Sequence, residues 1–316
     1  MKRLLSILVS LILLSLIYWK IDFRGLVQVF RDSHRWWLMV SLGMVVPLTL
    51  LTAWRLKRLM PHGAELGFGE ANRLILVASV LNMVLPSKMG DIAKAYFMKD
   101  RGHLGGSIAL SLVLFEKTCD MLSLLLWCVF GLLLYPNKGP LFWTMAGVVA
   151  LGLVFGLLLL GSRSFAQLFF GLGRRFAPRR LSPALQKLHT SWDEMLSYFW
   201  QEKAELYKVG LISVFIWSLH LLQIWLFILA LKSWAPFVAN LALSPLAILA
   251  GLLPFTFAGV GTRDAALIAF YQPFFNAPTA AALGVLCTSR YLLPAIGGLP
   301  FLGQYLVTAR GLRSFR

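Results

Sequence analysis

Eight ionisable residues lie within apolar stretches of this 316-residue chain. Each costs about 2.5–3.5 kcal/mol if it faces lipid at the centre of a membrane helix. Unpaired, the set would cost roughly 20–28 kcal/mol, more than the stability of about 5–15 kcal/mol of a typical protein. We therefore expect these side chains to face inward, where they pair with one another or line a hydrated cavity. They are Lys88, Asp91, Glu116, Lys117, Asp120, Arg263, Asp264 and Arg290.

Two of the carboxylates define the centre of the set. Glu116 and Asp120 lie four residues apart, on one face of a predicted helix, and Lys117 lies three residues before Asp120. Two carboxylates on one face repel each other unless a cation lies between them. Arg290 falls at nearly the same depth of the matching helix in the second half of the chain, so we expect it to be that cation.

Two interpretations of the charges stay open. In the first, they only hold the two halves of the chain together. In the second, Lys88, Arg263 and Arg290 present positive charge to an anionic group in a cavity near the membrane midplane, while Asn82 adds hydrogen bonds. Asp91, Asp264, Glu116 and Asp120 would then hold the cations in place and release them as access alternates.

The composition identifies the class of protein. Hydrophobic residues make up 59% of the chain and charged residues only 14%, against about 25% charged residues in a soluble domain. The chain is therefore predicted to be an all-α polytopic membrane protein. Its formal net charge of +17 is typical of basic cytoplasmic loops, and we expect no nucleic-acid partner. The five histidines and three cysteines show no metal-ligand spacing, and no nucleotide-binding motif is present, so no metal or other cofactor is expected.

Six apolar segments are predicted to cross the membrane with both termini in the cytoplasm. The positive-inside rule gives this orientation, because basic residues gather at 55–58, across 162–208 and at 310–316. This orientation places the loop 20–35 outside, although the rule would put its four basic residues on the cytoplasmic side. The predicted spans are Leu4–Trp19, Trp36–Trp54, Ser107–Tyr135, Leu141–Gly161, Tyr207–Leu231 and Ala280–Thr308.

Two shorter apolar stretches, 73–99 and 235–275, must leave and return on the same side of the membrane under this topology. Each is interrupted by Pro and Gly, at 85–91 and at 254–264, and these residues end helices. Both stretches are therefore predicted to be re-entrant helical hairpins. Irregular backbone at membrane depth must be covered by protein or line a water-filled cavity.

The spans and hairpins form an inverted repeat in this scheme, the pattern of many secondary transporters. We divide the single membrane domain into an N-terminal anchor and loop (1–35), a first inverted half (36–135), a connecting span with a basic cytoplasmic segment (136–206) and a second inverted half (207–316). Apolar residues at helical spacing within the basic segment predict an amphipathic helix in the membrane interface. An ordinary basic loop is the alternative.

Four motifs in order give the chain a family resemblance. They are Asn82-x-x-Leu85-Pro86-x-Lys88-x-Gly90-Asp91-x-x-Lys94, Glu116-Lys117-x-x-Asp120, Pro254-x4-Gly259-Val260-Gly261-x-Arg263-Asp264, and Arg290. This set resembles the lysylphosphatidylglycerol synthase transmembrane-region family, a flippase-like membrane domain, over about residues 5–308. The resemblance implies a prokaryotic inner-membrane protein that moves lipids between leaflets. It also implies that Gly90, Lys94, Gly259 and Gly261 belong to the substrate-binding motifs.

The chain departs from the family pattern at several motif positions. Lys88 stands where Arg is commoner, Ala258 replaces the first Gly of a pair, and Asp264 stands for Glu. Lys lacks the bidentate fork with which Arg grips a phosphate, which leaves the headgroup geometry open. The chain is expected to be a stand-alone member without the soluble synthase domain.

The leading functional hypothesis is a lipid translocator without enzymatic activity. It would move an anionic phospholipid, a glycolipid or a lipid-linked intermediate, and lipid-modifying enzymes are expected as further partners. Two other classes are open. One is a membrane-embedded transferase acting on a lipid headgroup, with Asp91 or Glu116 as general base. The other is a scaffold that organises lipid enzymes without transporting lipid.

Overall fold

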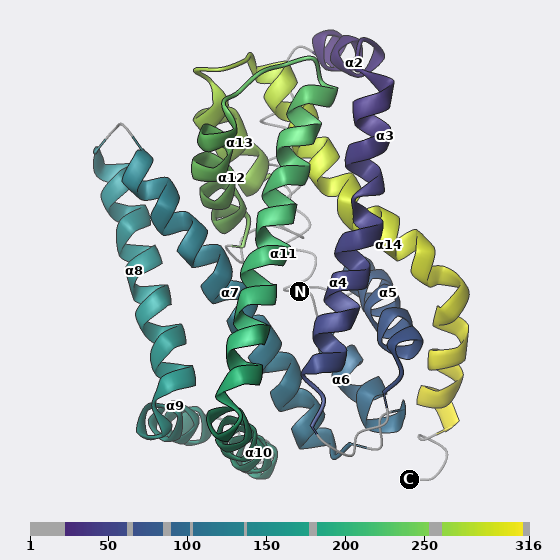
Figure 1. The fold of residues 1–316 in the computed structure, drawn as a ribbon, viewed down its shortest axis with the longest axis vertical. Coiled ribbons are helices and arrows are strands. Elements are labelled where there is room, and N and C mark those ends of the chain that lie inside the picture. The colour runs from purple at the N-terminus through teal and green to yellow at the C-terminus, as the bar shows by residue number, and fades with distance from the viewer. Residues whose placement is uncertain are drawn as a thin grey trace.

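The structure, a computed structural model, describes residues 23–61, 66–84, 90–101, 104–135, 138–176, 182–252 and 261–311. Throughout these ranges every regular element is a helix (Figure 1). This confirms the predicted all-α class.

Five segments in the described ranges are long and apolar enough to cross a membrane. They match five of the six predicted spans, and the sixth, Leu4–Trp19, lies outside the described residues. The first crossing consists of two consecutive helices. The crossing helices are α3 (Arg35–Gly43) with α4 (Val45–Arg58), α7 (Gly106–Leu134), α8 (Pro140–Gly161), α11 (Lys203–Ala230) and α14 (Ala277–Gly311).

The surface of α8 illustrates why these helices belong in a membrane. Pro140 occupies the start of the helix, where its missing N–H costs nothing. Leu151, Val154 and Leu157 then expose most of their side chains outside the bundle. An apolar face of this kind is disfavoured in water and favoured against lipid.

Two pairs of shorter helices lie between the long ones. The first pair is α5 (Phe68–Val84) and α6 (Gly90–Arg101), and the second is α12 (Phe237–Gly251) and α13 (Thr262–Tyr271). The two helices of each pair pack against each other, and the pairs occupy opposite ends of the bundle (Figure 1). Helix breaks were predicted at 85–91 and 254–264. Helix α6 already begins at Gly90 and α13 at Thr262, and residues 85–89 and 253–260 lie outside the described ranges.

The two helix pairs pack reciprocally on the opposite halves of the chain. The helix α5 of the first half packs along α14 of the second, and α12 of the second half packs along α7 of the first. A glycine makes each approach close. A Cβ at Gly298 of α14 would collide with the carbonyl of Leu76 on α5, and a Cβ at Gly131 of α7 with that of Ala242 on α12.

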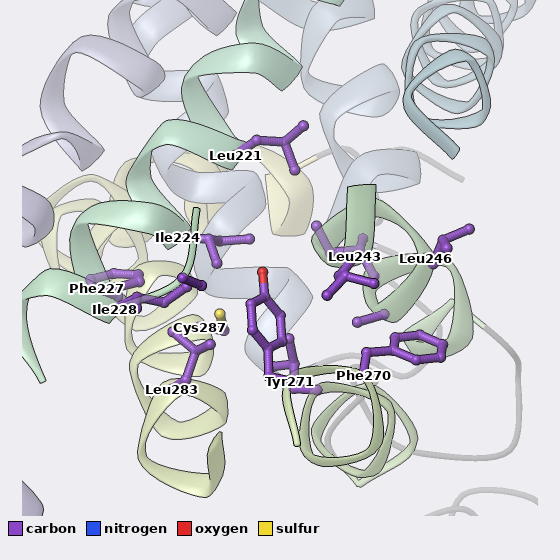
Figure 2. Packing of buried hydrophobic residues seen from close by; sticks show 14 of the residues in the cluster. Leu221, Ile224, Phe227, Ile228, Leu243, Leu246, Phe270, Tyr271, Leu283 and Cys287 are labelled. Carbon is purple, nitrogen blue, oxygen red and sulfur yellow. The ribbon is translucent and has the colours of Figure 1, made fainter. Parts of the chain in front are cut away.

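One apolar core fills the end of the bundle near α12 and α13. Figure 2 shows side chains from α11, α12, α13 and α14 converging there, among them Phe227, Leu243 and Leu283. Tyr271 carries a hydroxyl into this core. The hydroxyl donates to Oδ1 of Asn240 at 3.0 Å and lies 2.8 Å from Oγ of Ser244, so it is hydrogen-bonded despite full burial.

The segment 20–35 was predicted to be a loop, and this prediction is wrong for its described part. Helix α2 (Phe23–Arg31) forms there and packs against α14. Leu26 is buried and Phe30 packs against the core. These two residues are four apart, which places them on one helical face.

The basic segment after α8 contains two helices, α9 (Arg163–Phe176) and α10 (Ser182–Gln201). Both lie across the end of the long helices (Figure 1). The buried face of α10 packs on α7, where the rings of Phe115 and Phe199 stack with centroids 4.6 Å apart. Trp192 is buried in the same cluster.

Candidate functional site

Six ionised side chains from α4, α6 and α7 form a series of ion pairs with alternating charges. Within the described residues, each cation contacts at least one of the carboxylates and each carboxylate at least one cation, so the six charges balance. The series runs Lys94, Glu116, Arg55, Asp120, Lys117 and Asp91, and its first and last members both lie on α6. We call these residues the ion-pair ring.

Arg55 is the central cation of the ion-pair ring. It lies in the last turn of α4 and is only 2% exposed. Its Nη2 donates to Oε1 of Glu116 at 3.0 Å and to Oδ2 of Asp120 at 3.2 Å. Its Nη1 also binds Asp120 and donates to Oγ of Ser213 on α11 at 2.9 Å. A single guanidinium thus joins three helices.

The cation between Glu116 and Asp120 was expected to be Arg290, and the structure corrects this. Arg55 occupies that place instead. The predicted span ends at Trp54, which places Arg55 among the basic residues at the cytoplasmic side. The signal that was missed is periodicity: Leu48, Arg55 and Leu59 are buried at helical spacing, so Arg55 belongs to the inward face of α4.

The two lysines of the ring differ in exposure. Lys94 is buried and its Nζ contacts a carboxylate oxygen of Glu116. Lys117 is 45% exposed, with Nζ 3.1 Å from Oδ2 of Asp91 and 3.8 Å from Oδ2 of Asp120. The ion-pair ring is therefore buried at Lys94 and reaches the protein surface at Lys117.

Arg290, on α14, lies outside the ring. Its side chain is only 6% exposed, and its Nη2 donates to the hydroxyl of Tyr291 at 2.9 Å. Its Nε and Nη1 have no hydrogen-bond partner among the described residues, and no carboxylate there pairs with it. A buried guanidinium with free donors is costly unless a ligand, water or ion satisfies it.

The ring and Arg290 line one cavity of about 220 Å³. Its charged lining comprises four cations and three carboxylates among the described residues, an excess of one positive charge. Polar and apolar groups from α4, α5, α11 and α14 complete the walls. The uncharged lining residues are Val45, Leu48, Thr49, Thr52, Ile75, Ala78, Ser79, Asn82, Ile216, Trp217, His220, Gln223, Tyr291 and Pro294.

Two predicted binding residues of the first helix pair, Asn82 and Gly90, lie close to each other. Gly90 opens α6, and a Cβ there would lie 2.6 Å from the amide nitrogen of Asn82 and 2.7 Å from its Oδ1. Only glycine allows α6 to start this close to α5. Lys88, between them in sequence, lies outside the described residues.

The second helix pair holds its charges apart from the cavity. Arg263 and Asp264 are both buried, and Nη2 of Arg263 is 2.7 Å from Oδ1 of Asp264. The same nitrogen donates to the carbonyl of Gly284 and to Oγ1 of Thr288 on α14. Arg263 was predicted to share a cavity with Arg290, but it is not among the residues that line it.

Gly261 turns the chain into α13. Its φ of 103° lies in the left-handed region that favours glycine. Its amide donates to Oδ2 of Asp264 at 3.1 Å, which caps the helix. Asp264 therefore accepts a hydrogen bond from the backbone of the turn and also forms an ion pair with Arg263. Gly259, the other predicted glycine of this motif, lies outside the described residues.

The free N–H donors of Arg290 are groups that an anion can accept from. No group of three His, Cys, Asp or Glu residues in the described ranges is placed to hold a metal ion. The lining carboxylates are all ion-paired, whereas Arg290 offers free N–H donors.

Comparison with known proteins identifies the family. No curated protein matches the sequence. The family described as "Lysylphosphatidylglycerol synthase TM region" matches residues 3–298, and this confirms the resemblance carried by the four motifs. With a match over nearly the whole chain and helices able to span a membrane, the protein is a membrane protein of the lysylphosphatidylglycerol synthase transmembrane-region family.

Proposed function

We propose that the protein is a lipid translocator that binds an anionic lipid headgroup at Arg290. The observation that carries the proposal is the buried guanidinium of Arg290, which lines the cavity with free donors and without a counter-ion among the described residues. A phosphate group is the natural partner, because a guanidinium binds its oxygens through paired hydrogen bonds.

The cavity walls favour an amphiphile over a small soluble anion. Charged groups lie beside apolar side chains such as Leu48, Ile75 and Ile216, and the helices around the cavity are apolar enough to be surrounded by lipid. A lipid can place its headgroup among the charges and leave its acyl chains outside the bundle.

The reciprocal packing of the helix pairs supports an inverted repeat. In this proposal α5 with α6 and α12 with α13 are re-entrant hairpins that enter from opposite sides, and Leu4–Trp19 adds a sixth crossing. Each hairpin rests on the long helix of the other half. Movement of one half against the other would then expose the cavity to one leaflet at a time.

The ion-pair ring argues against the transferase alternative. A general base needs a carboxylate that can accept a proton from the substrate. Glu116 is 1% exposed and contacts Arg55 and Lys94, and Asp91 is paired with Lys117. We propose that these carboxylates hold the helices and the cations in place, and that the protein is not an enzyme.

The cellular setting is proposed from the basic loops and the family. The protein would lie in a prokaryotic inner membrane with both termini in the cytoplasm, and its other partners would be lipid-modifying enzymes. Either an ion gradient or the lipid gradient itself would drive transport.

A leaflet-resolved lipid assay in proteoliposomes tests the proposal. Fluorescent phosphatidylglycerol is placed in one leaflet, and its transfer is followed by reduction of the accessible dye. We expect wild-type protein to accelerate transfer over protein-free vesicles and Arg290→Gln to lose about tenfold or more of that rate. Arg73→Gln removes an exposed arginine of α5 that does not line the cavity, and it should keep the wild-type rate. No protein-dependent transfer, or equal rates for wild type and Arg290→Gln, would reject the proposal.

A further inference from the structure

Helix α9 exposes a continuous apolar face. Four of its large apolar side chains are exposed, and Phe176 leaves 83% of its surface uncovered. The four are Leu168, Phe169, Leu172 and Phe176. At about 100° per residue, they fall within an arc of roughly 100° around the helix axis. An exposed apolar face of this kind is typical of a surface that contacts lipid or another protein.

A different side of α9 holds this helix on the protein. Ala166 and Phe170 are buried, and both lie outside the apolar arc. The ring of Phe170 stacks on that of His189 on α10, with centroids 5.3 Å apart, and its centroid lies 6.0 Å from that of Trp192. The docking of α9 on α10 therefore leaves the apolar face available to a partner outside the chain.

The apolar face of α9 continues the lipid-facing surface of α8. Helix α9 begins directly after α8 ends and lies across its end (Figure 1). The ring of Phe155, an exposed residue of α8, packs edge-on against the rings of Phe169 and Phe165, with centroids 5.3 and 5.7 Å away. Because lipid that surrounds α8 at Phe155 also meets these side chains, the apolar face points toward the membrane. An amphipathic helix in the membrane interface has this placement.

The remaining side of α9 is basic. It carries Arg163, Arg174 and Arg175, and the helix contains no acidic residue. Nη2 of Arg163 donates to Oγ of Ser197 at 3.0 Å, and Arg174 contacts the side-chain oxygen of Gln186, so both partners are neutral. None of the three arginines forms an ion pair with a carboxylate of the described residues. Positive charge beside an apolar face is complementary to a leaflet that contains anionic lipid.

We infer that α9 forms a second lipid-binding surface, separate from the cavity at Arg290. The exposed side chains, such as Leu172 and Phe176, insert among the acyl chains of the leaflet at this end of the bundle. The arginines hold anionic headgroups of the same leaflet. This inference does not rest on the proposed function, because the surface binds lipid whether or not the cavity transports it.

The insertion of α9 is tested with spin labels on the full-length protein in vesicles of phosphatidylglycerol and phosphatidylcholine. Leu172→Cys labels the apolar face and Gln167→Cys the polar side of the same helix, while wild-type protein controls for the native cysteines, which are buried. We expect the label at 172 to collide more with oxygen and the label at 167 more with a polar nickel complex. A label at 172 that meets the nickel complex as readily as the label at 167 would overturn the inference. Shielding of the 172 label from both reagents would overturn it too, because a protein partner would then cover the face.

The contact with anionic headgroups is tested with two lipids that carry the same photoreactive acyl chain. Cross-links to α9 are mapped by mass spectrometry. We expect phosphatidylglycerol to label α9 about fivefold more than phosphatidylcholine, and Arg174→Gln with Arg175→Gln to reduce this preference to about twofold or less. Equal labelling by the two lipids in the wild type, or an unchanged preference in the double variant, would overturn the anionic contact.

Three control variants separate charge from structure and α9 from the cavity. Arg174→Lys with Arg175→Lys keeps the charge and should keep the preference, and its loss there would assign the effect to the contact with Gln186. Arg31→Gln with Arg35→Gln removes the same charge at the opposite end of the bundle (Figure 1) and should change nothing at α9. Arg290→Gln should also leave the labelling of α9 unchanged. A lost preference in this variant would assign the lipid to the cavity and reject a separate surface.

Discussion

Arg55 and Glu116, which are 61 residues apart in the chain, form a buried ion pair between α4 and α7 with Nη2 and Oε1 3.0 Å apart. Neither side chain has more than 2% of its surface exposed. Removing one partner of such a pair leaves an uncompensated buried charge. The pair therefore places a strong constraint on how the first half of the chain assembles.

The first prediction concerns the stability of the ion-pair ring. Arg55→Leu should lower the free energy of unfolding by about 3–5 kcal/mol, because Asp120 and Glu116 lose their shared cation. The double variant Arg55→Leu with Asp120→Leu leaves two complete pairs, Lys94 with Glu116 and Lys117 with Asp91. It should therefore be more stable than the single variant.

Titration of the detergent-solubilised protein with dodecyl sulfate, followed by tryptophan fluorescence, measures these differences. If the double variant is no more stable than Arg55→Leu, the pairing in the ring is not as described.

The second prediction tests the close approach of α5 and α14. Gly298→Ala places a methyl group against the carbonyl of Leu76 and should destabilise the protein by about 1–3 kcal/mol. Gly303→Ala on the same helix is the matched control, because a Cβ there meets nothing within 4 Å among the described residues. Equal thermal midpoints for the two variants in detergent would contradict the packing.

The sequence predicted the long helices well and the identity of the central cation poorly. The span predicted at Ser107–Tyr135 and α7 at Gly106–Leu134 differ by one residue at each end, because a long apolar run bounded by Gly and Pro allows few other structures. Arg55 was missed because hydropathy treats an arginine at the end of a span as the beginning of a loop. Its burial depends on Glu116 and Asp120, which are distant in sequence and meet it only after the helices pack.

The binding residues illustrate the same limit. Local spacing correctly placed Glu116, Lys117 and Asp120 on one helix, since residues three and four apart share a face. It could not decide that Arg263 pairs with Asp264 away from the cavity while Arg290 lines it. Both arginines lie in apolar segments of the second half, and only tertiary packing distinguishes them.

The third prediction concerns the docking of α10 on the long helices. Trp192 is 1% exposed and packs near Phe115 of α7, so Trp192→Ala should cost about 3–5 kcal/mol through the cavity it creates. Trp143, on α8, is 67% exposed, and Trp143→Ala should leave the thermal midpoint nearly unchanged. Limited proteolysis of the 162–206 segment should accelerate in the first variant only. Equal resistance in both would show that α10 is not anchored by this side chain.

The fourth prediction compares Asn240 and Tyr271, two members of the hydrogen-bonded group Asn240, Ser244 and Tyr271 in the apolar core. Nδ2 of Asn240 donates to the carbonyl of Leu221 at 2.8 Å, and its Oδ1 accepts from Ser244 and Tyr271. Asn240→Ala removes the acceptor that both buried hydroxyls share and leaves them only each other, so at least one loses its acceptor. It should therefore destabilise the protein by more than Tyr271→Phe, which should cost about 1 kcal/mol. The same dodecyl sulfate titration ranks the two variants. The reverse order would contradict the hydrogen-bond arrangement.

The central claim is that a lipid phosphate binds Arg290 in the cavity, and a cryo-electron microscopy structure in nanodiscs containing phosphatidylglycerol tests it most directly. We predict phosphate density within hydrogen-bonding distance, about 3 Å, of the Arg290 guanidinium. The same map of Arg290→Gln should lack this density. A cavity that holds only water, or an acyl chain against Arg290, would contradict the account.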